Sequence, residues 1–156
     1  MALDNKEITL LSALQDDGRI TNQQLADKSG MAASPCWRRV RQFEQQGVIQ
    51  GYQATLDRQK LGFGILAFIR IKIDSHDARQ AMRFESDVRQ LPQVIACYAT
   101  AGSSDFLLQV VERDLDHYSD FAMTVIRRLP GIKEMETTFV LREIKPPAGL
   151  PVEMLR

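Results

Sequence analysis

Apolar residues near the start of the chain repeat with the spacing of one helical face. The repeating positions are Ile8, Leu11 and Leu14. Asp4 precedes them, and Glu7 stands three residues after Asp4. This is the spacing of a capping box, in which each side chain accepts a hydrogen bond from the other residue's backbone N–H. The pattern predicts a helix that begins after Asp4 and ends near Gly18.

Two further helix starts follow within a short distance. Thr21 and Gln24 repeat the capping-box spacing, and Gly30 ends a helix of about two turns. Ser34 is a favourable N-cap, and Pro35 suits the first helical position, where a missing N–H costs nothing. Two short helices joined by a tight turn, with a third helix before them, predict a helix-turn-helix.

The third helix ends at Gly47, which favours a left-handed exit. At about 100° per residue, Cys36, Val40 and Phe43 share its core face. Arginine and glutamine occupy the opposite face, and their planar groups suit guanine and adenine edges in a major groove. The candidate DNA contacts are Ser34, Trp37, Arg38, Arg39, Arg41, Gln42 and Gln45. Of these, Arg38, Arg41 and Gln42 are expected to touch DNA, whereas Trp37 and Arg39 brace the helix or contact the DNA backbone. The alternative is a solvated surface shielded by the tryptophan.

A short β-rich segment separates the two halves of the chain. Residues 48–56 read as a strand interrupted by Gly51. A polar turn and the flexible sequence "LGFG" follow. We therefore expect one domain over residues 1–60 and a second over residues 61–156.

The second half repeats a strand–helix–strand pattern. Strands are predicted over residues 65–74, 94–101, 105–113 and 132–144, and helices over residues 78–91 and 115–129. This order is a ferredoxin-like βαββαβ unit, with both helices on one face of a four-stranded sheet. The fold class is therefore α+β. Stretches such as "FLL" from Phe106 and "FVL" from Phe139 are apolar on both strand faces. An exposed apolar sheet face is an association surface, so we expect at least a dimer.

The turn between the second and third strands contains groups that could bind a small molecule. Its sequence is "AGSSD", residues 101–105. Backbone N–H groups can hold a carboxylate there, and Asp105 can hold an ammonium group. The parts suit a small zwitterion, although a plain hairpin turn explains the same residues.

Composition and cysteine content narrow the possible classes of protein. Of the 156 residues, 44% are hydrophobic and 26% are charged, which is typical of a globular protein. The formal net charge is zero, so the protein as a whole has no long-range electrostatic attraction to DNA. We see neither a signal peptide nor a run of about 18 apolar residues, so no membrane partner is expected. Cys36 and Cys97 are predicted to be buried thiols rather than a disulfide. No His/Cys/Asp cluster has metal-ligand spacing, and no cofactor motif is present.

The combination of parts resembles the Lrp/AsnC family of transcriptional regulators. The resemblance rests on "LDNKEITLLSALQDDGRI", "QLADKSGMAASPCWRRVRQFEQQGVIQGY", "GSSDFLL" and "LPGIKEMETTF". It implies a winged-type helix-turn-helix followed by a regulation-of-amino-acid-metabolism domain, and dimers that often assemble into octamers. It also implies an amino acid or related metabolite bound at subunit interfaces beside a Gly-x-x-Asp turn. Gly102 and Asp105 match that turn, and the Thr137–Thr138 pair matches the polar pair that faces it. The candidate effector contacts are then Thr100, Ala101, Gly102, Ser103, Asp105, Thr137 and Thr138.

The expected function is therefore a cytoplasmic regulator that binds double-stranded DNA and a small effector. One alternative is an architectural protein that binds the chromosome without a ligand. A second is a small dimeric ferredoxin-like enzyme, but no convergent titratable groups appear. His76 and His117 stand alone near the starts of the two later helices and are predicted to be surface residues. The effector, the target genes, the sign of regulation and the choice between dimer and octamer stay open.

Overall fold

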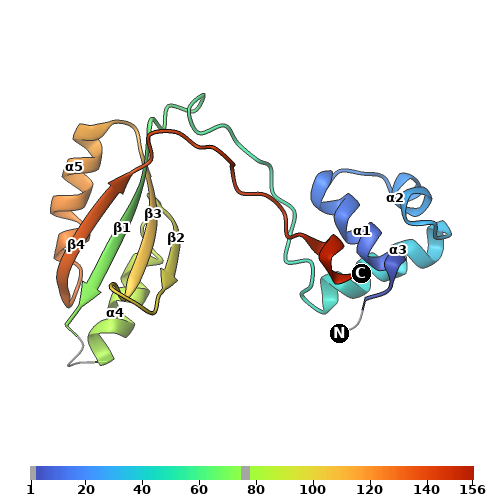
Figure 1. Cartoon of the computed structure of the whole chain (residues 1–156), viewed down its shortest axis with the longest axis horizontal. Helices are drawn as coiled ribbons and strands as arrows, with labels where there is room; N and C mark the ends of the chain where they lie inside the picture. The colour runs from blue at the N-terminus through green and yellow to red at the C-terminus, as the bar shows by residue number, and fades with distance from the viewer. Residues whose placement is uncertain (1–2, 75–77) are drawn as a thin grey trace. The chain divides into compact units, whose positions relative to one another are not determined.

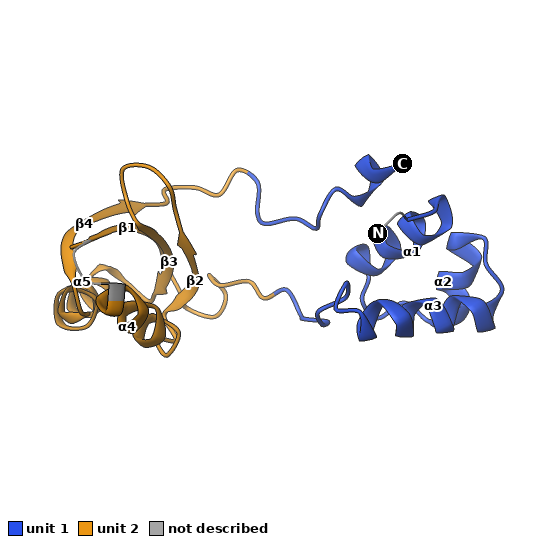
Figure 2. Ribbon diagram, turned by 90° about the horizontal axis from the view of Figure 1, so that it is seen from below, with its two compact units in different colours: residues 1–55, 145–156 blue, residues 56–144 orange. Residues whose placement is uncertain are grey.

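The computed structural model describes residues 3–74 and 78–156 and divides into two compact units (Figure 2). One unit holds the chain up to Thr55 together with Lys145–Arg156, and the other holds Leu56–Ile144. The sequence predicted that everything after residue 60 belongs to the second domain. The structure instead assigns the last twelve residues to the first unit, for the reason given below.

The first unit is built on three helices, α1 (Asn5–Asp16), α2 (Asn22–Ser29) and α3 (Ala33–Gln45) (Figure 1). Both predicted capping boxes are confirmed. The side chains of Asp4 and Glu7 cap α1 reciprocally, and those of Thr21 and Gln24 cap α2. Gly30 then takes a left-handed φ of 64°, which any residue with a Cβ adopts at a cost. The helix-turn-helix geometry is thus specified by local sequence.

The start of α3 differs from the prediction. The N-cap is Ala32, which makes no side-chain capping bond, so the assignment of Ser34 as the cap is wrong. Ser34 and Pro35 are the second and third helical residues. The first helical bond runs from the Cys36 N–H to the Ala32 carbonyl at 3.0 Å. Since the first N–H groups of any helix lack intrahelical acceptors, a proline is tolerated throughout this turn and does not mark the first position.

The core of the first unit lies between the three helices, and the predicted inner face of α3 is confirmed. Cys36 and Phe43 are fully buried, and Val40 packs against them. The buried residues of the cluster are Leu10, Leu11, Ala13, Leu25, Ala26, Cys36 and Phe43.

The strand predicted over residues 48–56 is wrong. The chain leaves α3 through Gly47, at a φ of 71°, and runs without strand pairing up to β1. The N–H groups of Val48 and Ile49 both donate to the Phe43 carbonyl, at 2.9 and 3.1 Å. An extended segment becomes a strand only beside a second strand, and no described segment of this chain pairs with it.

The end of the chain packs on the first helix. A short 3-10 helix, η2 (Val152–Leu155), lies in the first unit (Figure 1). The Gln15 side chain donates to the Leu150 carbonyl at 2.9 Å and accepts from the Leu150 N–H at 2.6 Å. The Arg156 guanidinium donates to the Thr9 hydroxyl at 3.2 Å. These contacts hold the end of the chain against α1 and so add residues that are distant in sequence to the first unit.

The second unit has the predicted βαββαβ order. Its elements are β1 (Ile65–Ile73), α4 (Ala78–Val88), β2 (Val94–Ala99), β3 (Phe106–Glu112), α5 (Leu115–Thr124), the 3-10 helix η1 (Ile126–Arg128) and β4 (Ile132–Phe139). The sheet order is β2-β3-β1-β4, and all pairs are antiparallel. β4 is shorter than predicted because β1 begins at Ile65, so no partner continues beyond the bond from the Val140 N–H to the Leu66 carbonyl.

Helices α4 and α5 cover the same face of this sheet (Figure 2). The face is apolar because alternate residues of β1 and β3 point to it. The buried cluster comprises Ala67, Ile69, Ile71, Ile73, Phe84, Val88, Phe106, Leu108, Val110, Tyr118, Phe121, Ala122 and Ile126. No helix in the described chain is long and apolar enough to cross a membrane.

The opposite sheet face is only partly apolar. Phe68 and Leu107 are half-buried, and Tyr98 is 55% exposed. Beside them, Arg70 pairs with Glu136 at 3.4 Å, and Lys72 pairs with Glu134 at 3.8 Å. The predicted apolar face is therefore confirmed for one part of the sheet and wrong for the part that these ion pairs cover.

The contacts of the chain end lead to a stability prediction. Gln15→Ala removes two hydrogen bonds and should lower the free energy of unfolding of the first unit by about 0.5–1.5 kcal/mol. Deleting residues 145–156 should lower it by about 1–3 kcal/mol, since apolar contacts of the segment are lost as well. Trp37, the single tryptophan, reports on this unit in a urea titration. Gln23→Ala, an exposed glutamine of α2, is the matched control and should change stability by less than about 0.5 kcal/mol. Equal midpoints for Gln15→Ala and the parent would show that the segment does not stabilise the unit.

Candidate nucleic-acid interface and effector site

The outer face of α3 presents the side chains that the sequence singled out. Arg38, Arg41, Gln42 and Gln45 are exposed, as is Ser34 at the start of the helix. Among the described residues, no hydrogen bond or ion pair involves the Arg38 side chain. The burial of Cys36 and Phe43 on the other side holds this face outward. Contact with DNA stays a prediction.

A chain of side chains holds Arg41 in place. Its guanidinium lies 5.4 Å from the ring centroid of Trp37, within cation–π range, and 3.3 Å from a carboxylate oxygen of Glu44. The other oxygen of Glu44 accepts from the Tyr52 hydroxyl at 3.1 Å. Burial, and then the carboxylate of Glu44, raise the pKa of Tyr52. Tyr52 lies beyond the helix, so the helical periodicity of α3 does not point to it.

Arg39 braces the fold. Its Nε lies 2.9 Å from Oε1 of Glu7, whose side chain is only 8% exposed. Sequence reasoning assigned Glu7 to the cap of α1 and missed this second partner, because the ion pair joins two separate helices. Arg39 therefore links the outer face of α3 to α1.

The β2–β3 turn keeps an open space beside its backbone. Gly102 has a φ of 144°, and apart from its two chain neighbours no described residue has an atom within 4 Å of the position that a Cβ would occupy. The Thr100 N–H donates to the Asp105 carbonyl at 2.8 Å, and the Thr100 hydroxyl donates to the Ser104 carbonyl at 2.7 Å. Ala101, Gly102 and Ser103 are exposed. The turn is thus ordered at its base and accessible at its tip.

Asp105 has a structural role in this turn. Its Oδ2 accepts from the Ile73 N–H at 2.8 Å, and its own N–H donates to the Ile71 carbonyl at 2.9 Å. No described residue donates a hydrogen bond to Oδ1. One carboxylate oxygen therefore anchors the turn to β1.

Thr137 and Thr138 do not meet the turn within one chain. They pair with Ile69 and Phe68 on the β4 side of β1, whereas the turn joins β2 and β3 on the other side. The Thr137 hydroxyl shares a hydrogen bond with the Tyr118 hydroxyl of α5. Thr138 is exposed on the opposite sheet face. Within one chain, Thr137 and Thr138 are therefore separated from the turn by β1.

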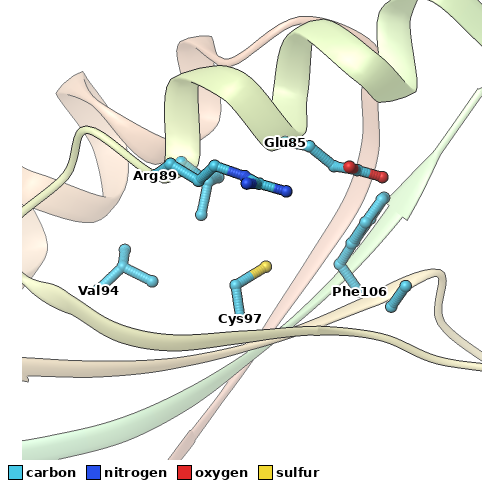
Figure 3. A pocket seen from close by; sticks show the side chains of 7 residues that line it. Glu85, Arg89, Val94, Cys97 and Phe106 are labelled. Atoms are coloured by element: carbon cyan, nitrogen blue, oxygen red, sulfur yellow. The ribbon is translucent and has the colours of Figure 1, made fainter. Parts of the chain in front are cut away.

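A hollow lies between α4 and β2, on the helix-covered side of the sheet (Figure 3). Its volume is about 470 Å³, and Glu85, Arg89, Val94, Cys97 and Phe106 are among the residues that line it. Both cysteines are free thiols, as predicted, and Cys36 is buried. The prediction that Cys97 is buried is wrong, because β2 is an edge strand that α4 covers incompletely. Partial burial and then the Glu85 carboxylate raise the pKa of the Cys97 thiol, so it stays protonated at neutral pH.

The described residues offer no convergent catalytic or metal-binding set. No group of three His, Cys, Asp or Glu among them could hold a metal ion. His117 is exposed, as predicted, and its ring lies 2.8 Å from the Asp114 carboxylate, which raises the pKa of the imidazole. His76 lies outside the described residues.

Comparison with known families identifies both units. Residues 3–50 match the winged helix-turn-helix DNA-binding family. Residues 66–150 match the Lrp/AsnC ligand binding domain. The chain belongs to the Lrp/AsnC family of transcriptional regulators. It is therefore a DNA-binding regulator with a ligand-binding domain and not an enzyme, and the predicted family, fold class and function are confirmed.

Individual relatives of this Lrp/AsnC chain align over nearly its whole length. The DNA-binding transcriptional activator DecR of Escherichia coli (strain K12) is 32% identical over 97% of this chain and 99% of DecR. The leucine-responsive regulatory protein of Rhizobium meliloti (strain 1021) is 36% identical over 92% of each chain. A transcriptional regulator of Neisseria meningitidis, solved in complex with L-Met, has 34% identity and a TM-score of 0.94, covering 99% of this chain and 100% of that one.

Proposed function

We propose that this regulator reads operator DNA with the outer face of α3 and responds to an amino acid, or a related metabolite, bound at the β2–β3 turn. It acts as a homodimer or a larger homo-oligomer in the cytoplasm. The observation that carries the proposal is the arginine- and glutamine-rich face of α3, which the buried Cys36 and Phe43 hold outward.

Arg38 and Arg41 are suited to different parts of DNA recognition. Arg38 is exposed and has no partner among the described residues, so its guanidinium is available for bidentate bonds to guanine O6 and N7. Arg41 is held by Trp37 and Glu44, which lowers the entropy lost when it binds. The exposed Ser34 hydroxyl lies at the N-terminus of α3, where phosphate oxygens are favoured.

The effector part of the proposal rests on the turn and on the relatives. Backbone N–H groups beside Gly102 can take a carboxylate, and Oδ1 of Asp105 can take an ammonium group. One relative was solved with L-Met, and others are leucine-responsive by name. Titrating the twenty amino acids, starting with L-methionine and L-leucine, separates this function from that of an architectural protein without a ligand.

Assembly supplies the missing half of the effector site. The half-buried Phe68 and Leu107, with the exposed Tyr98, form an apolar patch that a second copy can cover. A neighbouring subunit can also bring Thr137 and Thr138 to the turn. A two-fold dimer reads half-sites one helical turn apart, or a multiple of that spacing.

The DNA-reading face is tested by removing its arginines one at a time. Arg38→Ala and Arg41→Ala should each weaken operator binding roughly 5- to 150-fold, because a lost bidentate base contact costs roughly 1–3 kcal/mol. Fluorescence anisotropy with a labelled operator duplex at fixed salt measures this loss. Arg142→Ala, which removes the same charge from an exposed position of the second unit, should bind almost as the parent does. Parent-like affinity of both folded α3 variants would place the interface elsewhere.

The effector site is tested with Asp105→Asn. The amide oxygen of asparagine can still accept from the Ile73 N–H, so the turn should keep its shape while the charge is lost. A charge-assisted bond of roughly 1.5–3 kcal/mol then disappears, so the effector concentration for half-maximal response should rise at least tenfold. DNA affinity without effector should stay nearly unchanged. The readout is a set of DNA-binding curves with and without the responsive amino acid.

Asp87→Asn on α4 is the matched control for this change, since it removes an exposed carboxylate outside the turn. It should respond to the effector as the parent does. A parent-like response of Asp105→Asn itself would remove the effector from this turn.

A further inference from the structure

We propose that Glu7 is a positioning residue for base selectivity: through Arg39 it fixes the side-chain amide of Gln42 with its N–H donors turned toward DNA. The inference rests on the proposed function, because it takes the outer face of α3 as the reading surface. It adds a residue of α1 to the determinants of specificity.

The Glu7 carboxylate is buried and fully engaged. Its Oε2 accepts from the Asp4 N–H at 2.8 Å, which completes the capping box of α1. Its Oε1 lies 2.9 Å from Nε of Arg39. A buried carboxylate is stable only when it is paired and hydrogen-bonded, so Glu7 holds the guanidinium of Arg39 at a fixed place.

Arg39 transmits this constraint to the outer face. Its Nη1 donates to Oε1 of Gln42 at 2.8 Å. The guanidinium is planar and has donors only, so it meets Glu7 with one edge and accepts no bond from Gln42. The amide of Gln42 must therefore turn its oxygen toward Arg39, and this settles which end of the amide is oxygen and which is nitrogen.

The consequence is a change in what Gln42 can read. A free glutamine pairs with adenine by accepting from N6 and donating to N7. Here the amide oxygen faces Arg39, and no described residue accepts from the side-chain nitrogen of Gln42, which is exposed. The side-chain nitrogen of Gln42 then presents donors, which suit guanine O6 or N7, thymine O4 and adenine N7. Two-bond pairing with adenine would also need Oε1 to accept from N6 with its second lone pair while it keeps the bond from Arg39.

Two variants of the network separate positioning from folding. Glu7→Gln keeps an oxygen for the Asp4 N–H, because glutamine also serves in a capping box, but it removes the charge that holds Arg39. Arg39→Lys keeps a positive charge opposite Glu7 but lacks the planar fork that holds Glu7 and Gln42 together. Gln24→Ala, which opens the capping box of α2, is the control for a general loss of stability.

The experiment uses the full-length protein and a duplex that the parent selects from a random-sequence pool. Affinities are measured for this duplex and for all its single base-pair substitutions. Gln42→Ala should reduce base discrimination at one base pair at least fivefold. Glu7→Gln and Arg39→Lys should reduce it at the same base pair, whereas Gln24→Ala should leave the parent's profile. Arg38→Ala should reduce discrimination at a different base pair.

The outcomes distinguish the positioning role from the reading face itself. Suppose that Arg38→Ala changes the base preferences and that Gln42→Ala removes the preference at one base pair. If Glu7→Gln and Arg39→Lys then keep the parent's preference at that base pair, the positioning role is overturned and the reading face stands. If neither Arg38→Ala nor Gln42→Ala changes any preference, the reading face is wrong, and the positioning role falls with it.

Discussion

The buried side of α3 is the constraint on which the account of DNA recognition depends. Cys36 and Phe43 are buried completely between the helices of the first unit. Turning α3 far enough to present a different face would expose Phe43, at a cost of about 1.5–3 kcal/mol, and would bury arginine without a partner. The ion pair between Glu7 and Arg39 opposes the same rotation. Core packing and electrostatics thus select one orientation of the helix, and the chemistry of the outer face follows from it.

In the second unit, too, packing buries one face of an element and leaves the other face exposed. β1 lies between β3 and β4, and two helices cover one of its faces. In the proposed function, a second copy covers the other face and a ligand binds at the tip of the β2–β3 turn. A ligand shifts an assembly only by binding its alternative states with different affinity. The proposed site, completed by a neighbouring subunit, would provide such a difference, because separated subunits would offer only half of it.

Features set by local sequence could be predicted, and features set by distant contacts could not. Both capping boxes and the end of α2 at Gly30 depend on residues three or four positions apart, and the structure has them where the sequence placed them. The prediction of a strand over residues 48–56 was wrong, because a strand forms only by pairing with a second strand. The bonds between Gln15 and Leu150 join residues 135 positions apart, and no periodicity reports such a contact.

The candidate sites divide in the same way. Helical periodicity correctly assigned the inner and outer faces of α3, since both follow from one repeat. It could not find Glu7 or Tyr52 as supports of the arginines, because these residues lie on other segments. Cys97 was misassigned because an alternating strand pattern does not tell whether a helix covers the strand completely.

The unique tryptophan offers the most direct test of the claim that α3 reads DNA. Trp37 lies on α3, is 53% exposed and contacts Arg41. Acrylamide quenching of its fluorescence should be measured in the free protein and with saturating operator duplex. The account predicts that DNA shields Trp37 and lowers the quenching constant at least twofold. An unchanged quenching constant, in samples whose DNA binding is verified by gel shift, would contradict it.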